Sequence, residues 1–248
     1  MQDTGFKISK VLEYEEVSST SDLCFELIEK GETEGIAVIA LSQTKGRGRR
    51  GHVWVSPENA GLYLSFIMAV PKKYPSQLIP LALALSVLRC VKRKTPGASI
   101  KWPNDVLVKG KKIAGCLAEA KKGYIVAGVG VNLNNTPDSF PDPIGKTATS
   151  LKIETGSTEN RKEFSGLLLS ELESVFGELE KTGAKVFLKE LKENCSTLGA
   201  QTKYSGADGL SKGVARDIDR LGGLIIERVD GKIEVIYCGE EANGGQRP

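Results

Sequence analysis

The sequence predicts an α+β protein in which a mixed β-sheet with flanking helices is followed by a small β-rich domain. Short apolar, β-branched runs alternate with amphipathic helical stripes as far as about residue 195. Beyond that point the chain consists of short apolar runs separated by turn residues. We therefore expect a larger domain over 1–195, a smaller one over 196–240 and a frayed tail over 241–248.

The larger domain is expected to begin with a helix and two strands. Ser19 or Thr20 can cap the helix at its start, and Gly31 suits its end. The run 36–43 is short and apolar, which indicates a buried strand that places Gln43 at its end. A second strand of the same kind is expected over 61–70.

The rest of the chain continues this alternation. Leucines spaced three and four residues apart predict an amphipathic helix over 77–93. The following elements are then strands over 98–102, 105–108, 112–119 and 124–133, and helices over 160–182 and from residue 184 onward. In the smaller domain, two apolar runs flank Asp230-Gly231, which is a strong signal for a β-hairpin.

The overall composition excludes several classes of function. A formal net charge of +3 is too small to make the whole molecule a polyanion binder. The five cysteines are scattered and form no C-x-x-C pair, so neither a disulfide framework nor a zinc site is expected, and a reducing cytoplasm fits best. The single histidine, His52, excludes Ser-His-Asp and Cys-His catalysis, and we assign it no role. No apolar run is long enough to span a membrane.

The stretch "KGRGRRGHVW", residues 45–54, concentrates cations on a glycine-rich piece of backbone. Its glycines let backbone N–H groups approach a ligand, and its arginines offer fork-shaped donors to carboxylate or phosphate. We expect this loop to wrap an anion and to be mobile when it is empty. A solvated basic loop or a nucleic-acid contact remains an alternative, although nucleic acid usually requires several phosphate contacts along a surface.

Three further motifs place cations and glycines at strand ends or on strand faces. In "KWPND", Lys101 ends a β segment and Pro103 bars a helix, although Pro-Asn-Asp is also ordinary turn chemistry. In "KGKKIAG", lysines precede a strand that holds Gly115, which indicates close approach of a ligand or another backbone; a lysine-decorated turn is the alternative. In "GVGVNLN", Gly128 and Gly130 share one face of a strand, which leaves that face open.

None of these motifs pairs a nucleophile with a base, so positioning and charge neutralisation are the chemistry that fits them. In order and spacing, "QTKGRGRRGHVW", "KWPNDVLV", "KIAGCLAE", "GVGVNLN" and "ATSL" resemble the biotin–protein ligases over nearly the whole chain. The resemblance implies a class II synthetase and biotin–lipoate ligase type of catalytic domain over 1–195. It also implies an SH3-like β-barrel over 196–240, and the monofunctional class without DNA-binding helices.

The resemblance further implies roles for individual residues. Biotin is expected to contact Ser19, Thr20, Ser21, Gln43, Gly46, Arg47, Gly48, Arg49, Lys101 and Gly115. The nucleotide is expected to contact Arg49, Arg50, Trp54, Asn104, Lys111 and Asn132, and the expected catalytic residues are Arg49, Lys101 and Lys111. No residue is expected to bind a metal. Ser21 stands where the family usually has asparagine.

The implied reaction joins biotin to ATP as biotinyl-5′-AMP and passes biotin to a lysine of a biotin carboxyl carrier protein. Because carboxylate and phosphate repel each other, stacked cations and Mg²⁺ are the main requirement, and the loop would exclude water. The alternatives are a lipoate–protein ligase, a biotin-binding protein without catalysis and a nucleic-acid-binding module. A homodimer joined at a sheet edge and a cytoplasmic location are also expected, with neither DNA nor membrane as a partner.

Overall fold

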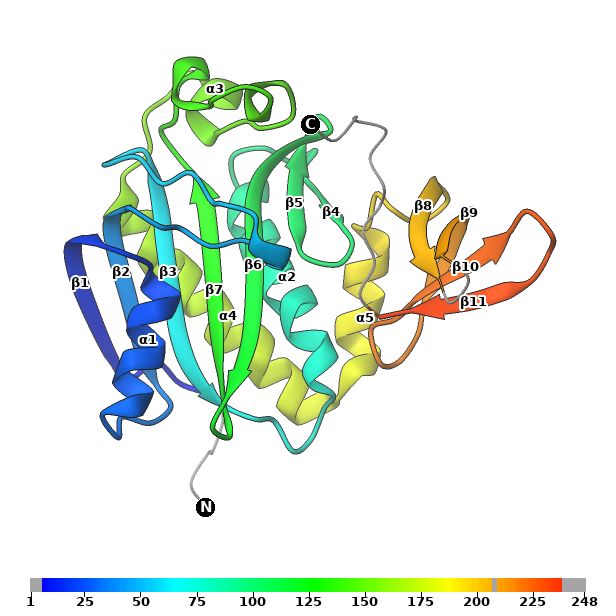
Figure 1. Cartoon of the computed structure of the whole chain (residues 1–248), viewed down its shortest axis with the longest axis horizontal. Helices are drawn as coiled ribbons and strands as arrows, with labels where there is room; N and C mark the ends of the chain where they lie inside the picture. The colour runs from blue at the N-terminus through cyan, green and yellow to red at the C-terminus, as the bar shows by residue number, and fades with distance from the viewer. Residues whose placement is uncertain (1–5, 207–208, 238–248) are drawn as a thin grey trace.

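The computed structural model describes residues 6–206 and 209–237 (Figure 1). Within these ranges a seven-stranded mixed sheet has the order β1-β2-β3-β7-β6-β5-β4. The strands are β1 (Lys10–Val17), β2 (Ile36–Gln43), β3 (Gly61–Ala69), β4 (Ser99–Lys101), β5 (Asp105–Val108), β6 (Lys111–Lys121) and β7 (Tyr124–Asn132). Only β1 and β2 pair in parallel among these described strands. The mixed sheet of the predicted α+β class is thereby confirmed.

Helices cover both faces of this sheet. Helix α1 (Thr20–Glu29) lies on one face, and α2 (Ile79–Lys92), α4 (Arg161–Thr182) and α5 (Ala184–Glu193) lie on the other (Figure 1). Strand β2 is apolar over residues 36–41 because alternate side chains enter two different cores. Ile36 and Val38 pack with α1, whereas Ala37 and Ile39 join the larger core under α2 and α4.

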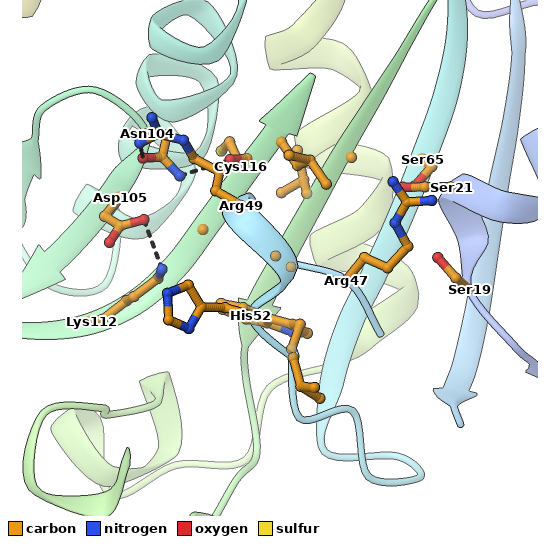
Figure 2. A pocket seen from close by; sticks show the side chains of 18 of the residues that line it. Ser19, Ser21, Arg47, Arg49, His52, Ser65, Asn104, Asp105, Lys112 and Cys116 are labelled. Atoms are coloured by element: carbon orange, nitrogen blue, oxygen red, sulfur yellow. Dashed lines mark hydrogen bonds and ion pairs between the residues drawn. The ribbon is translucent and has the colours of Figure 1, made fainter. Parts of the chain in front are cut away.

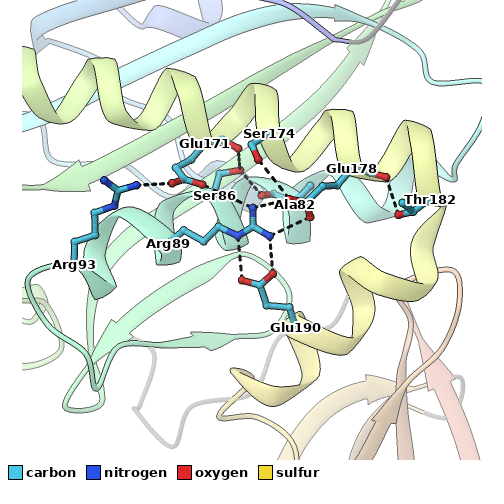
Figure 3. A network of polar contacts seen from close by, with 9 residues as sticks. All are labelled: Ala82, Ser86, Arg89, Arg93, Glu171, Ser174, Glu178, Thr182 and Glu190. Carbon is cyan, nitrogen blue, oxygen red and sulfur yellow. Dashed lines mark hydrogen bonds and ion pairs between the residues drawn. The ribbon is translucent and has the colours of Figure 1, made fainter.

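An arginine-centred cluster fixes the three helices of the larger core to one another (Figure 3). Arg89 of α2 donates to both carboxylate oxygens of Glu178 on α4, each at 3.1 Å. It also donates to Glu190 on α5, at 3.0 Å from Nε and 2.6 Å from Nη2. Hydrogen bonds to Glu190, opposed by burial, raise the pKa of Arg89, so its charge persists at any physiological pH.

The C-terminal part forms a separate antiparallel sheet of four described strands in the order β11-β10-β9-β8. They are β8 (Gln201–Gly206), β9 (Gly209–Ile218), β10 (Leu224–Arg228) and β11 (Ile233–Ile236). The predicted hairpin at Asp230-Gly231 joins β10 to β11, and Gly231 has the positive φ of 80° that favours glycine. Trp102 ties this sheet to the larger body, because its indole Nε1 donates to Gly222 O at 3.0 Å.

Two elements were not predicted, and the domain limits remain a prediction. Strand β1 is an edge strand with mostly exposed side chains, so its sequence lacks the apolar run that marked the buried strands. Helix α3 (Leu151–Thr155) has only five residues and no stripe to detect. The expected tail over 241–248 lies outside the described residues. None of the described helices is long and apolar enough to cross a membrane.

Candidate active site

A cavity of about 510 Å³ opens on the α1 side of the sheet, between the start of α1, loop 45–54 and the β4–β5 turn (Figure 2). Strands β3, β6 and β7 form its floor. The predicted site residues that line it are Ser19, Thr20, Ser21, Gln43, Arg47, Gly48, Arg49, Arg50, Trp54, Lys101, Asn104 and Gly115. Segments far apart in the sequence therefore meet at one site.

Uncharged hydrogen-bonding groups form one end of the cavity, here called the neutral end and made of Thr20, Ser21, Gln43 and Ser65. The Ser65 hydroxyl lies 2.7 Å from that of Thr20 and 3.0 Å from that of Ser21. Gln43 Oε1 accepts from Thr20 N at 2.8 Å, and Gln43 Nε2 donates to Ser56 Oγ at 2.8 Å. These bonds fix donors and acceptors that a polar, uncharged ligand group can meet.

Ser65 was missed by the sequence reasoning, although the sequence contained a signal. It is the single serine inside the apolar strand β3, and a buried polar group in such a strand needs a partner. Strand β3 pairs with β7 so that Ser65 lies opposite Gly128. Its hydroxyl thereby reaches the start of α1 on the cavity side.

Glycines make the middle of the floor flat enough to receive the Trp54 ring. Gly115 and Gly130 are direct partners on β6 and β7. A Cβ added at Gly130 would lie 2.8 Å from Trp54 Cζ2, and one at Gly115 would lie 3.0 Å from Trp54 Cζ3. The indole Nε1 of Trp54 is buried and has no hydrogen-bond partner among the described residues, so it is a donor available to a ligand.

Positive charge gathers at the opposite end, here called the cationic end and made of Arg49, Lys101 and Lys112. Strand β4 ends at Lys101 and β5 begins at Asp105, so the turn between them faces the cavity. Lys112 Nζ lies 2.8 Å from Asp105 Oδ1 and 5.4 Å from the centroid of the Trp54 ring. The cationic end therefore offers three positive groups beside a single acidic lining residue, Asp105.

Asn104 connects the loop to the floor at the cationic end (Figure 2). Its Oδ1 accepts from Arg49 Nη1 at 2.9 Å, and its Nδ2 donates to Cys116 O at 2.8 Å. Cys116 is part of the floor, but its side chain packs with Val129 in the core on the other face of the sheet, and burial raises the pKa of its thiol. The thiol is accordingly protonated and uncharged at neutral pH, which agrees with a site that uses no nucleophilic cysteine.

Loop 45–54 adopts a hairpin with a short 3-10 turn, η1 (Arg49–Gly51), at its tip. Trp54 N donates to Gly46 O at 3.0 Å, Gly48 N to His52 O at 2.7 Å and His52 N to Arg49 O at 3.1 Å. A Cβ at Gly46 would lie 2.7 Å from Ser56 Oγ, so this position needs glycine. The expected mobility of the empty loop stays a prediction.

Three predicted residues do not line the cavity. Lys111 is exposed at the start of β6, and its neighbour Lys112 points inward instead; the run of lysines alone could not distinguish the two. Asn132 is buried and donates from Nδ2 to Thr149 O at 2.9 Å, which anchors the chain after β7. Gly46 lines a second hollow, beside Leu117 and Glu119. His52, to which we assigned no role, lines the main cavity.

No group of three or more His, Cys, Asp or Glu side chains able to hold a metal ion exists within residues 6–206 and 209–237. The expectation that no residue binds a metal stays a prediction.

Comparison with known proteins places these features in a family. A model described as "Biotin/lipoate A/B protein ligase family" matches residues 14–134. The bifunctional ligase/repressor BirA of Bacillus spizizenii is 32% identical over 232 residues, which cover 90% of this chain and 71% of that protein. A biotin (acetyl-CoA-carboxylase) ligase of Mycobacterium tuberculosis is 31% identical over 230 residues, which cover 90% of this chain and 84% of that protein.

A solved structure extends the likeness to three dimensions. The biotin protein ligase of Aquifex aeolicus, in complex with biotin and ATP, superposes with a TM-score of 0.83 at 33% sequence identity. The match covers 94% of this chain and 97% of that chain, so both sheets described above have counterparts there.

Proposed function

The chain belongs to the biotin/lipoate A/B protein ligase family, and on that premise we propose that it is an ATP-dependent biotin–protein ligase. It forms biotinyl-5′-AMP from biotin and ATP, and then transfers biotin to a lysine of a biotin carboxyl carrier protein. One observation carries the proposal: a single cavity has an uncharged hydrogen-bonding end and a cationic end, joined by a glycine floor.

Adenylation requires two anions to approach each other. A carboxylate oxygen of biotin forms a bond to the α-phosphorus of ATP, while the bond from that phosphorus to the departing pyrophosphate breaks. Arg49, Lys101 and Lys112 offset the repulsion and the charge that develops on the phosphoryl oxygens. No proton has to be removed from biotin, because its carboxylate is ionised at neutral pH. An enzyme base is therefore unnecessary in this step.

Transfer then requires a neutral amine. The carrier lysine loses one proton to solvent, and its nitrogen then forms an amide bond with the biotin carbonyl carbon. The bond between that carbon and the AMP oxygen breaks, AMP leaves as an anion, and the amide nitrogen releases its second proton to solvent. The adenylate has to survive until the carrier arrives, so water must be kept from its carbonyl. Loop 45–54 covers the cavity and is the segment we assign to this task.

We expect biotin to place its ureido ring at the neutral end and its carboxylate at the cationic end. A ureido group has two N–H donors and one carbonyl acceptor, which match the fixed hydroxyl and amide groups of Thr20, Ser65 and Gln43. The dithiolane ring of lipoate has no such groups and would leave these buried polar atoms without partners. This match favours biotin over lipoate as the substrate.

We propose that Mg²⁺ binds together with ATP. When bound, it would neutralise phosphate charge. Mg²⁺ is commonly held by substrate phosphates with one or two protein carboxylates, and Asp105 is the carboxylate that lines the cationic end. Because Asp105 pairs with Lys112 in this structure, most of the metal's oxygen ligands would have to come from the nucleotide and water.

Mass spectrometry of a biotin carboxyl carrier domain tests the function. The domain is incubated with the protein, ATP, Mg²⁺ and either biotin or lipoate, and we expect a mass increase of one biotin and none from lipoate. An unmodified domain after incubation with biotin, or modification by lipoate alone, would refute the proposed function.

The homodimer, the cytoplasmic location and the absence of DNA binding stay predictions. Light scattering of the ligand-bound protein would test the homodimer.

A further inference from the structure

Arg47 of loop 45–54 binds two carboxylates that lie on different elements of the chain. Its Nη1 donates to Asp22 in the first turn of α1, and its Nη2 donates to Glu119 on β6. Its guanidinium also lies 5.7 Å from the centroid of the Phe25 ring. Figure 2 shows Arg47 directed toward the α1 side, whereas Arg49 extends toward Asn104. One side chain thus connects the loop with both a helix and the sheet.

The charges around Arg47 argue against an anion-binding role. Asp22, Arg47 and Glu119 together carry a net charge of −1, so a carboxylate or phosphate brought beside Arg47 would meet two carboxylates already bound there. Burial lowers the pKa of Arg47, but the hydrogen bond to Asp22 and the charge of Glu119 outweigh that effect and raise it. Arg47 is therefore fully charged, and its charge is already balanced inside the protein.

The position of Arg47 in the loop connects its ion pairs with Asp22 and Glu119 to the loop backbone. Its backbone forms an antiparallel bridge with Val53, so holding Arg47 also holds the second strand of the loop hairpin. Glu119 contributes more than a surface charge, because its Oε2 is buried and has no hydrogen-bond partner among the described residues. The Arg47 contact is the interaction that offsets the burial of this carboxylate.

We propose that Asp22 and Glu119 are positioning residues that bind Arg47 and keep loop 45–54 closed over the cavity, both before and after ligand binds. The second part rests on the proposed function: with the loop held, biotinyl-5′-AMP is retained until the carrier arrives. Arg47 then acts through the loop backbone and not as a direct contact for biotin. This role differs from the biotin contact that the family resemblance implied for Arg47.

Amide hydrogen exchange in the protein without ligand tests the first part. The informative donors are Gly48 N, His52 N and Trp54 N, whose bonds exist only in the folded loop. We expect Asp22→Asn and Glu119→Gln each to speed their exchange about five- to tenfold, which is the effect of losing one partly exposed charged hydrogen bond. In an Arg47→Gln background neither substitution should add to the effect, because their shared partner is gone.

A matched control separates this role from general effects of charge on α1. Asp22 also lies in the first turn of α1, where a carboxylate stabilises the helix by itself. Glu29 is on the same helix and pairs with Lys121 and Lys122, away from the loop. Glu29→Gln should leave loop exchange unchanged. The proposal would be wrong if Asp22→Asn accelerated amide exchange in the loop as much in the Arg47→Gln background as it does alone. It would also be wrong if the loop of the Asp22→Asn/Glu119→Gln double variant exchanged like that of wild type.

Retention of the adenylate tests the second part. Biotinyl-5′-AMP is loaded onto wild type and onto the double variant, and its release is followed by rapid filtration. We expect at least about tenfold faster release from the variant, in proportion to loop opening. Faster exchange with unchanged release would overturn the claim that the cluster retains the intermediate. If wild type formed and bound no adenylate, the proposed function would fail, while the exchange experiment would still decide the role of Asp22 and Glu119.

Discussion

The two ends of the cavity differ in how their polar groups are arranged. At the neutral end, Thr20, Ser65 and Gln43 bind one another through short hydrogen bonds, so their geometry is set before ligand arrives. At the cationic end, Lys112 lies between Asp105 and the Trp54 ring, and Arg49, Lys101 and Lys112 together outnumber the one acidic residue of the lining, Asp105. This difference indicates that one end recognises the substrate while the other lowers the barrier to reaction.

The largest effect is expected from removing a positive charge at the cationic end, which tests the difference between the two ends directly. Lys112→Ala should reduce the rate of adenylate formation about 100- to 1,000-fold, because a preorganised positive group at the reacting oxygens is lost. Lys101→Ala should behave in the same way. The measurement is biotin-dependent exchange of radiolabelled pyrophosphate into ATP under saturating biotin.

Lys111→Ala is the matched control for Lys112→Ala. It removes the adjacent lysine, which is exposed and lies outside the cavity lining. We expect a rate within about twofold of wild type, as for other surface charges. Equal losses in the two variants would contradict the assignment of Lys112 to the cationic end.

The floor between the two ends provides the next largest effect. Gly130→Ala would put a Cβ 2.8 Å from Trp54 Cζ2, so the ring would have to leave its position. An overpacked contact of this kind costs about 1–3 kcal/mol, so we expect catalytic efficiency, kcat/KM for biotin, to fall about tenfold to a hundredfold. Gly166→Ala, in α4 with nothing within 4 Å, should leave activity unchanged. Wild-type efficiency in Gly130→Ala would show that the ring does not need this floor.

Substitution at the neutral end should affect binding more than rate. Ser65→Ala removes a hydroxyl within reach of both Thr20 and Ser21, and we expect the KM for biotin to rise about five- to tenfold with kcat nearly unchanged. Ser86→Ala is the control, because its buried hydroxyl donates to Ala82 O at 2.9 Å far from the cavity. A fall in kcat with unchanged KM would reverse the roles assigned to the two ends.

The smallest effect concerns the Cys116 thiol, which is buried in the core beneath the cavity floor. Burial raises the pKa of Cys116 above its ordinary value of 9.0, so the thiol stays protonated as the pH rises through 9. Burial of the neutral Cys116 thiol is compatible with full stability of the folded state below pH 9. That contribution is lost at higher pH, because there the unfolded chain releases the thiol proton and the folded protein does not. At pH 8.5 we expect iodoacetamide to modify Cys116 at least about tenfold more slowly in the folded protein than in guanidinium. Equal rates, measured by peptide mass spectrometry, would show that the thiol is neither buried nor held in its protonated form in the folded protein.

Much of the scaffold could be predicted because its buried elements have strong periodic signals. Strand β2 and helix α2 are apolar on the faces that enter the core, and their sequences show it. The edge strand β1 could not be found in this way, since it buries little of either face. The arginine cluster around Arg89 was also beyond prediction, because its partners Glu178 and Glu190 are about ninety to a hundred residues away in sequence.

The site was predicted best where glycine or backbone geometry selects the residue. Gly115 and Gly130 lie on an open strand face, as the strand pattern indicated, but that this face receives the Trp54 ring was not predicted. Side-chain direction was harder to predict: Lys112 enters the cavity whereas Lys111 was named, and the buried amide of Asn132 donates to Thr149 O outside the cavity lining. The nucleotide contacts expected for Lys111 and Asn132 stay predictions. Asp22 and Glu119 carried no sequence signal, because a carboxylate pair becomes visible only when the arginine between them is placed.

The account depends most directly on whether this one cavity activates biotin. Pyrophosphate exchange into ATP by the wild-type protein, measured with biotin, with lipoate and with neither, tests that claim without any carrier protein. We predict that biotin supports exchange. With lipoate, or without either acid, the exchange rate should be at most about a tenth of the rate with biotin. Exchange that is independent of biotin, or faster with lipoate, would contradict the pairing of a neutral recognition end with a cationic reaction end.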